Sequence, residues 1–140
     1  SVYRKLINEA DVISLLKKNG YTIINPQQYT INEQIELFAD AQKIVAPMGS
    51  SLANLVFCKA GTEVVEIAPL FKNKNETIVA ERYKNLCKIC SLNYRKIIAE
   101  TVDVKVHSKL AEKYISKAIL QKSSYYKNLI VQMKQIEKLI

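Results

Sequence analysis

The sequence predicts an α/β fold, built on a mainly parallel sheet of the Rossmann-like, doubly wound kind. Short β-branched runs end at proline or glycine turns, and helical patterns of about ten to fifteen residues separate them. Neighbouring parallel strands need a crossover of about that length, which is usually a helix and right-handed. We therefore expect four or more strands with helices on both faces.

The first half of the chain supplies most of these elements. Gly20 follows a helical pattern at the position where a left-handed C-cap residue is favoured, and Thr30 with Glu33 forms a capping-box sequence. In chain order we expect a helix over 6–19, a strand over 21–25, a helix over 31–40, a strand over 43–46, a helix over 52–57 and a strand over 63–67.

The second half continues with a helix over 76–91 and a strand over 95–99, and from Ser108 the pattern is helical to the end. We expect residues 1–107 to form the Rossmann-like domain and residues 108–140 a helical segment of the same domain. Apolar residues of this segment fall on heptad spacing: Ile115, Ile119, Tyr126, Leu129, Met133, Ile136 and Ile140. This stripe packs on its own domain, forms a dimer seam or covers a second domain.

Composition excludes several classes of protein. Three cysteines suit a reducing compartment rather than a disulfide scaffold, and Cys87 and Cys90 lie in a helical pattern as buried thiols. His107 has no partner for a metal or catalytic pair. No apolar run is long enough to span a membrane, so we expect a cytoplasmic or membrane-peripheral protein, or a protein of the ER or Golgi lumen in a eukaryote.

Charge is uneven along the chain. Residues 1–70 carry 6 basic and 7 acidic side chains, whereas residues 71–140 carry 15 and 6. A basic half attracts phosphate groups, but no basic-aromatic interleaving or nucleic-acid motif accompanies it. We therefore predict no nucleic-acid partner.

The residues after the 43–46 strand are the best candidate for a binding site. Ligands of open parallel sheets bind beyond the carboxyl ends of strands, where a helix amino terminus offers free N–H groups to phosphate. Gly49 permits close backbone approach, Ser50 and Ser51 offer hydroxyls, and Asn54 lies one helical turn further on the same face. A simple helix cap is the alternative interpretation.

Glu66 is the second candidate, near the carboxyl end of the 63–67 strand. Val64, Val65 and Ile67 surround it in a segment that reads as buried on both faces. A carboxylate there is costly unless it is paired or reaches a polar cleft, where it could bind ribose hydroxyls. A salt bridge to a nearby lysine or arginine is the alternative.

Several positions, taken in order, resemble the carboxy-terminal domain of glycosyltransferase family 61, from Arg4 to about Pro69. The resemblance rests on Arg4, Asn8-Glu9, Gly20, Ile24, Pro26, Glu33-Gln34-Ile35, Ala41, Ile44-Val45, Gly49, Leu52-Ala53-Asn54, Phe57, Gly61, Val65-Glu66-Ile67 and Pro69. It implies the donor-binding half of an inverting, metal-independent transferase of the two-domain GT-B type. The sequence contains no Asp-x-Asp motif of metal-chelating transferases.

The resemblance also implies roles for single residues. Arg4 would face the diphosphate of a nucleotide-sugar, with Asn8 nearby, and the turn from Gly49 to Ser51 would cradle that diphosphate. Asn54 would support the turn, and Glu66 would bind ribose. Glu33 and Gln34 would orient the helix beneath the cleft, which is closer to a structural role.

The implied reaction moves a sugar from a nucleotide donor, UDP-linked in our expectation, to a glycan, polysaccharide or protein acceptor, with no cofactor. We expect a missing amino-terminal domain to supply the general base, so that this chain alone binds donor without transferring sugar. We also expect the chain to self-associate as a homo-oligomer, because its interdomain face and heptad stripe would be exposed.

One departure from the family pattern is Met48, where the family usually has a histidine. Either the donor differs or activity is reduced. Two rival functions remain: a non-enzymatic scaffold assembling through the carboxy-terminal helix, and another Rossmann-like transferase or epimerase.

Overall fold

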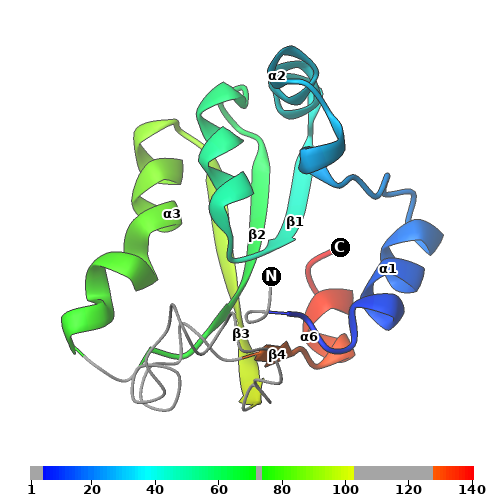
Figure 1. Ribbon diagram of the computed structural model, residues 1–140, viewed down its shortest axis with the longest axis vertical. Helices are drawn as coiled ribbons and strands as arrows, with labels where there is room; N and C mark the ends of the chain where they lie inside the picture. Colours follow the sequence, from blue (N-terminus) through cyan, green and yellow to red (C-terminus); the bar gives the residue numbers. More distant parts are fainter. Residues whose placement is uncertain (1–4, 72–73, 103–127) are drawn as a thin grey trace, which may run out of the picture.

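The computed structural model describes residues 5–71, 74–102 and 128–140, which form one four-stranded sheet in the order β1-β2-β3-β4 (Figure 1). The strands are β1 (Lys43–Pro47), β2 (Glu63–Pro69), β3 (Asn93–Val102) and β4 (Asn128–Ile130). β1, β2 and β3 are parallel, and β4 is antiparallel to β3. The predicted α/β class is confirmed.

Helical elements lie between and around the strands. They are α1 (Glu9–Lys18), η1 (Pro26–Gln28), α2 (Ile31–Asp40), η2 (Ser50–Phe57), η3 (Lys74–Glu76), α3 (Thr77–Ile89) and α6 (Met133–Glu137). The capping box is confirmed, since Thr30 Oγ1 accepts from Glu33 N at 3.3 Å and Glu33 Oε2 accepts from Thr30 N at 2.7 Å. Gly20 has the expected positive φ of 81°.

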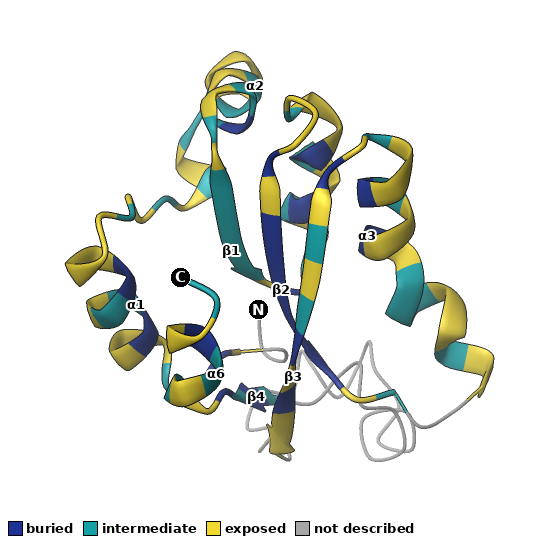
Figure 2. Cartoon of the chain, turned by 180° about the vertical axis from the view of Figure 1, so that it is seen from behind, coloured by how far each residue is buried: buried dark blue, intermediate teal, exposed yellow. Residues whose placement is uncertain are grey.

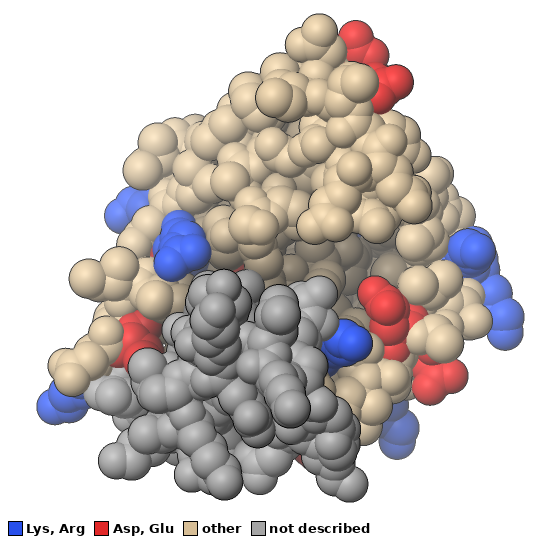
Figure 3. Space-filling model, in the orientation of Figure 1, with Lys and Arg blue, Asp and Glu red and all other residues tan. Residues whose placement is uncertain are grey.

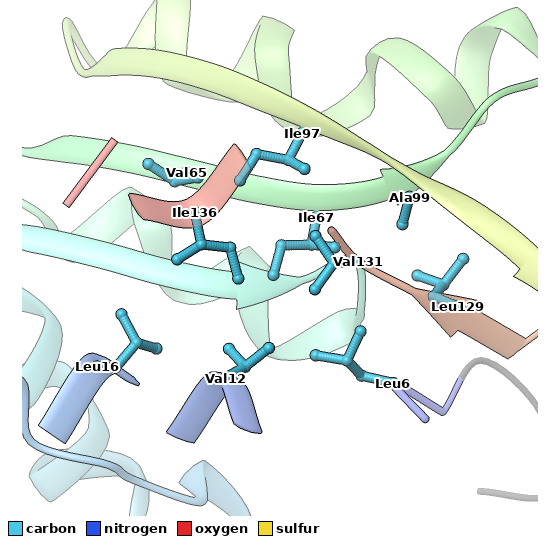
Figure 4. Close-up of a cluster of buried hydrophobic side chains, with 10 residues drawn as sticks. All are labelled: Leu6, Val12, Leu16, Val65, Ile67, Ile97, Ala99, Leu129, Val131 and Ile136. Carbon is cyan, nitrogen blue, oxygen red and sulfur yellow. The ribbon is translucent and has the colours of Figure 1, made fainter. Parts of the chain in front are cut away.

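The core divides into two clusters, one on each face of the sheet. Alternation along β2 creates this division, because Val65 and Ile67 join one cluster while Val64 and Ala68 join the other. The first cluster packs β2 and β3 against α1, β4 and α6 (Figure 4), with Leu6, Val12, Leu16, Val65, Ile67, Ile97, Ala99, Leu129, Val131 and Ile136.

The second cluster packs the other face against α2, η2 and α3. Its buried members are Phe38, Met48, Leu52, Leu55, Val64, Ala68, Tyr83, Cys87 and Leu92. β2 runs between the two clusters and is buried from Val64 to Pro69, as its unbroken dark colour shows (Figure 2). A strand buried on both faces is typical of parallel sheets.

The winding of the sheet is simpler than predicted. A doubly wound sheet reverses its strand order, with a later strand placed beyond the first. Among the described strands the order follows the chain, and none lies beyond β1. η2 lies between β1 and β2, and α3 lies between β2 and β3. Both pack in the second cluster, so both crossovers place a helix on the same face.

The strand expected over 21–25 is absent from the sheet, and this prediction was wrong. The residues take no regular secondary structure, although Tyr21 packs against the first cluster and Ile24 against the second. β-Branched residues favour extended backbone, but a strand also needs a hydrogen-bonded neighbour. β1 pairs with β2 alone in the described residues.

The helix predicted through residues 128–130 was also wrong, because those residues form β4. Leu129 pairs with the amino-terminal segment on one side, where Ile7 N donates to Leu129 O and Leu129 N donates to Lys5 O, both at 2.8 Å. On the other side β4 pairs with β3. Backbone partners on both sides override a helical pattern of side chains.

The heptad stripe is therefore tested only at its end. Leu129 and Ile136 are buried in the first cluster, and Met133 and Ile140 pack against it, so this part of the stripe contacts its own domain. Residues 103–127, which include His107, Ile115, Ile119 and Tyr126, lie outside the described residues. In the described part of the chain, no helix has the length and hydropathy to cross a bilayer.

Candidate functional site

The turn after β1 lies at the carboxyl ends of the parallel strands, as predicted. Met48 is the first residue beyond β1, and its N–H donates to Ile67 O at 2.8 Å, which continues the ladder with β2. Its side chain is 6% exposed within the second cluster. Methionine at this position therefore contributes packing and presents no polar group to a ligand.

Gly49 follows in an extended conformation, with φ −174° and ψ 168°. Any residue adopts such backbone, and in the part of the chain that the structure describes a Cβ built on Gly49 would meet only Pro47 O, at 3.8 Å. The fold thus needs no glycine here for backbone reasons. What the glycine leaves is space above the backbone, at a strand end, that none of the described residues fills.

Ser50 and Ser51 open η2, which is a 3-10 helix and not the α-helix expected over 52–57. Ser50 is exposed and Ser51 half-buried. Within residues 5–71, 74–102 and 128–140, neither hydroxyl has a hydrogen-bond partner. The first N–H groups of any helix lack intrahelical acceptors, so the turn presents both hydroxyls and backbone donors.

Asn54 lies on the side of η2 that contacts α2. Its Nδ2 donates to Gln34 Oε1 at 2.9 Å, and Gln34 Nε2 donates to Tyr29 O at 3.0 Å. Glu33, beside Gln34, closes the capping box of α2. The contact between Asn54 and Gln34 joins η2 to α2, whereas Glu33 caps α2 itself. The supporting roles of these three residues at a binding site stay predictions.

Glu66 lies at the middle of β2 and not near its end, because β2 continues to Pro69. Its side chain faces the second cluster and is 1% exposed. Tyr94 of β3 donates its hydroxyl to Glu66 Oε2 at 2.5 Å. The buried carboxylate is therefore satisfied by a tyrosine, a partner that neither sequence interpretation had named.

Burial is the main influence on the pKa of Glu66 and raises it above its ordinary value. The Tyr94 hydrogen bond and the charge of Lys96 act in the opposite direction. Lys96 does not form a salt bridge with Glu66; its Nζ donates to Ala80 O at 2.7 Å. Ribose binding by Glu66 stays a prediction, and in this structure the carboxylate lies beneath the surface.

Two other predicted donor residues lie at the amino-terminal end of the chain. Asn8 forms a reciprocal pair with Val131, since Nδ2 donates to Val131 O at 2.7 Å and Oδ1 accepts from Val131 N at 3.2 Å. Arg4 lies outside the described residues. The structure thus groups Gly49, Ser50 and Ser51 at one turn and places Asn8 against the carboxy-terminal segment.

Two open hollows mark the described surface. One, of about 530 Å³, runs between η2 and α3, and Ser50, Arg82 and Tyr83 are among its lining residues. The other, of about 450 Å³, lies at the amino ends of β2 and β3 and includes Glu63, Asn93 and Arg95. Of these two, the first adjoins the candidate turn, since Ser50 lines it. The second lies at the end of the sheet opposite to the carboxyl ends, where ligand sites of parallel sheets form.

Tyr83 was not found from the sequence. Its hydroxyl donates to Gly49 O at 2.6 Å, across 34 positions of the chain. No local pattern connects a tyrosine in the middle of one helix with a glycine before another. Only the packing of α3 beside η2 brings them together.

The cysteines behave as structural thiols in the described residues. Cys87 is buried, Cys58 and Cys90 are half-buried, and all three are free. Burial raises the pKa of Cys58 and of Cys87 to about 11. No group of histidine, cysteine and acidic residues in the described ranges could hold a metal ion.

Charged side chains are scattered over the face shown in Figure 3. Basic and acidic groups are interspersed on the described part of this face and do not gather in one patch. Surface ion pairs occur among the described residues, such as Lys84 with Glu81 at 2.9 Å.

Residues 1–65 of the chain match the model of a protein family described as Glycosyltransferase 61. The matched residues include α1, α2, β1 and η2, and hence the whole candidate turn, but stop just before Glu66. A search of curated proteins found no match. The family match supports assignment of the chain to glycosyltransferase family 61, through its amino-terminal 65 residues.

Proposed function

We propose that this chain is the donor-binding part of an inverting, metal-independent glycosyltransferase, and that the turn at Gly49, Ser50 and Ser51 holds the diphosphate of a nucleotide-sugar. The acceptor is a glycan, a polysaccharide or a protein, and the donor is UDP-linked. In this proposal the sheet is one Rossmann-like half of a GT-B fold, and a second domain covers the turn.

The observation that carries the proposal is the open side of Gly49. The glycine stands at a strand end, in backbone that any residue could adopt, and among the described residues a Cβ at this position would have no neighbour closer than 3.8 Å. Two serine hydroxyls without partners in the described residues follow it. Free donors around a glycine that no described residue covers suit an anionic group that approaches the backbone closely.

The chemistry of sugar transfer requires such a group. When the sugar leaves the donor, negative charge develops on the diphosphate, and preorganised donors stabilise it. One backbone donor of this kind contributes about 3 kcal/mol in a closed active site, and much less where water competes. We therefore expect the isolated chain to bind UDP weakly. The donors should contribute fully only when a second domain covers the site.

The remaining predicted residues take indirect roles in this proposal. Asn54 fixes η2 through Gln34, so it supports the turn without touching the donor. Glu66 would need Tyr94 and α3 to move before it could meet ribose, so we leave it out of the proposed contacts. The general base comes from the second domain, since inversion needs it beside the acceptor.

Calorimetric titration of the purified chain with UDP tests the proposal, with ADP and inorganic phosphate titrated in parallel. We expect UDP to bind and phosphate alone to bind more weakly. A transfer assay with UDP-sugars and glycan acceptors should show no turnover. If the chain binds no nucleotide, the donor-site proposal is wrong and the scaffold alternative gains support; turnover at an ordinary enzymatic rate would place a base within these residues.

A further inference from the structure

Tyr83 connects the middle of α3 with the turn after β1. The residue is 4% exposed within the second cluster, and its hydroxyl donates to Gly49 O at 2.6 Å. Burial of the ring requires only an aromatic side chain. The hydroxyl adds one thing, a hydrogen bond to the carbonyl that precedes the two serines.

This hydrogen bond controls the orientation of one peptide group. Gly49 O also accepts from Leu52 N, at 3.1 Å, so both lone pairs of the carbonyl are used. A glycine peptide would otherwise rotate more freely than any other. In a trans peptide the C=O and the N–H point in opposite directions, so with Gly49 O turned toward α3, the N–H of Ser50 points away from it.

We propose that Tyr83 is a positioning residue for nucleotide-sugar binding: its hydroxyl holds the Gly49–Ser50 peptide so that the Ser50 N–H faces the diphosphate. This rests on the proposed function. Tyr83 does not touch the donor in this arrangement, because its hydroxyl is occupied by Gly49 O on the buried side. It acts through the orientation of the turn.

A neighbouring charge lies close to the Tyr83 ring. The guanidinium of Arg82 lies 5.9 Å from the centroid of the Tyr83 ring, within the range of a cation–π contact. Arg82 is exposed and lines the same hollow as Ser50. The ring is thus held by the core on one side and by Arg82 at the surface.

The test compares Tyr83→Phe with Thr62→Val as a matched control. Phenylalanine keeps the ring and removes only the hydroxyl. Thr62 is also buried, and its hydroxyl donates to Lys59 O at 2.8 Å, with Ala41 O as the alternative acceptor at 3.2 Å. It precedes β2, at the end of the sheet opposite the turn. Each variant loses one buried hydroxyl, so each should lower the melting temperature by a few degrees.

Binding of UDP should separate the two variants. We expect Tyr83→Phe to weaken UDP binding by about three- to tenfold and Thr62→Val to leave it unchanged. The amide of Leu52 should also exchange faster with solvent in Tyr83→Phe alone. Equal UDP affinity in Tyr83→Phe and the unaltered chain overturns the role of Tyr83 and leaves the donor site standing.

Failure of the proposed function gives a different result. If the unaltered chain does not bind UDP, the donor site fails and the role of Tyr83 toward it falls too. Leu52 exchange then shows whether Tyr83 orders the turn for a structural reason alone.

Discussion

Asn8 and Val131 hold the amino- and carboxy-terminal segments of the chain together through one side-chain amide. Asn8 Nδ2 donates to Val131 O at 2.7 Å, and Val131 N donates to Asn8 Oδ1 at 3.2 Å. The amide thus mimics a backbone neighbour for a residue that has just left β4. It satisfies both polar groups of Val131, whose side chain is 2% exposed.

Replacing Asn8 with alanine should lower the free energy of unfolding by about 1–3 kcal/mol, because the N–H and C=O of Val131 would lose their partners in a buried place. Urea unfolding measures the change. Asn19→Ala is the control, since Asn19 is exposed and its amide bonds within its own turn, to Leu15 O. A loss no larger than in the control would show that water replaces the pair.

Replacing Glu66 with glutamine should stabilise the chain relative to the unaltered chain, by an amount that grows as pH rises. Burial raises the pKa of Glu66 in the folded chain above the ordinary 4.5, so the folded state holds its proton more tightly than the unfolded state. The stability that this group contributes is present below the unfolded pKa and is lost as pH rises through the folded pKa. Glutamine keeps an oxygen that accepts from Tyr94 and cannot ionise.

Urea unfolding at several pH values from 4 to 8 checks this prediction. The difference in stability between Glu66→Gln and the unaltered chain should grow with pH and then level off above the folded pKa. Glu36→Gln, at an exposed position of α2, should show a smaller change with pH. A difference that shrinks as pH rises would contradict the assigned effect of burial.

Replacing Gly49 with valine should weaken UDP binding at least tenfold while changing stability little. The backbone of Gly49 is extended and has room for a side chain, so valine should leave the fold intact. Its side chain should instead block the diphosphate that approaches the glycine. Gly61→Val provides the opposite case: its φ of 88° strains any side chain, so stability should fall by about 1–2 kcal/mol or more. Calorimetry and thermal melting of both variants separate these effects. Unaltered UDP affinity in Gly49→Val would remove the turn from the donor site.

Alkylation of Cys87 in the folded chain should be slow. Burial raises the pKa of the thiol from 9.0 to about 11, which leaves about a hundredfold less thiolate at pH 8. Mass spectrometry after timed treatment with iodoacetamide measures the rate, with the chain in urea as control. Equal rates in the folded and unfolded chains would mean that Cys87 is accessible to reagent.

Local signals predicted the elements that depend on a few neighbouring residues. The Thr30 capping box and the positive φ of Gly20 are set within one turn of a helix, and both are present. Residues 128–130 carry a helical pattern and yet form β4, because their backbone partners are β3 and residues 5–7. Those partners are far away in the sequence and leave no local trace.

The candidate site shows the same contrast between features that depend on neighbouring residues and features that depend on distant ones. The turn at Gly49 was predicted because glycine and two serines after a strand form a local pattern. Tyr83 and Tyr94 were missed because each meets its acceptor only when two separate elements pack together. A carboxylate among valines signalled that Glu66 needs a partner, but nothing in the sequence said that the partner is a tyrosine.

The residues of the second core cluster are all synthesised before those of the first cluster are complete. The buried members of the second cluster all come from residues 38–92, whereas the first cluster joins Leu6 to Ile136. A ribosome synthesises the chain from its amino terminus. The face that carries η2 and α3 can therefore assemble before α6, which packs against α1, has been made. α1 lacks its contact with α6 until the carboxy-terminal residues emerge, so during that interval part of its apolar face, with Val12 and Leu16, is open to chaperones.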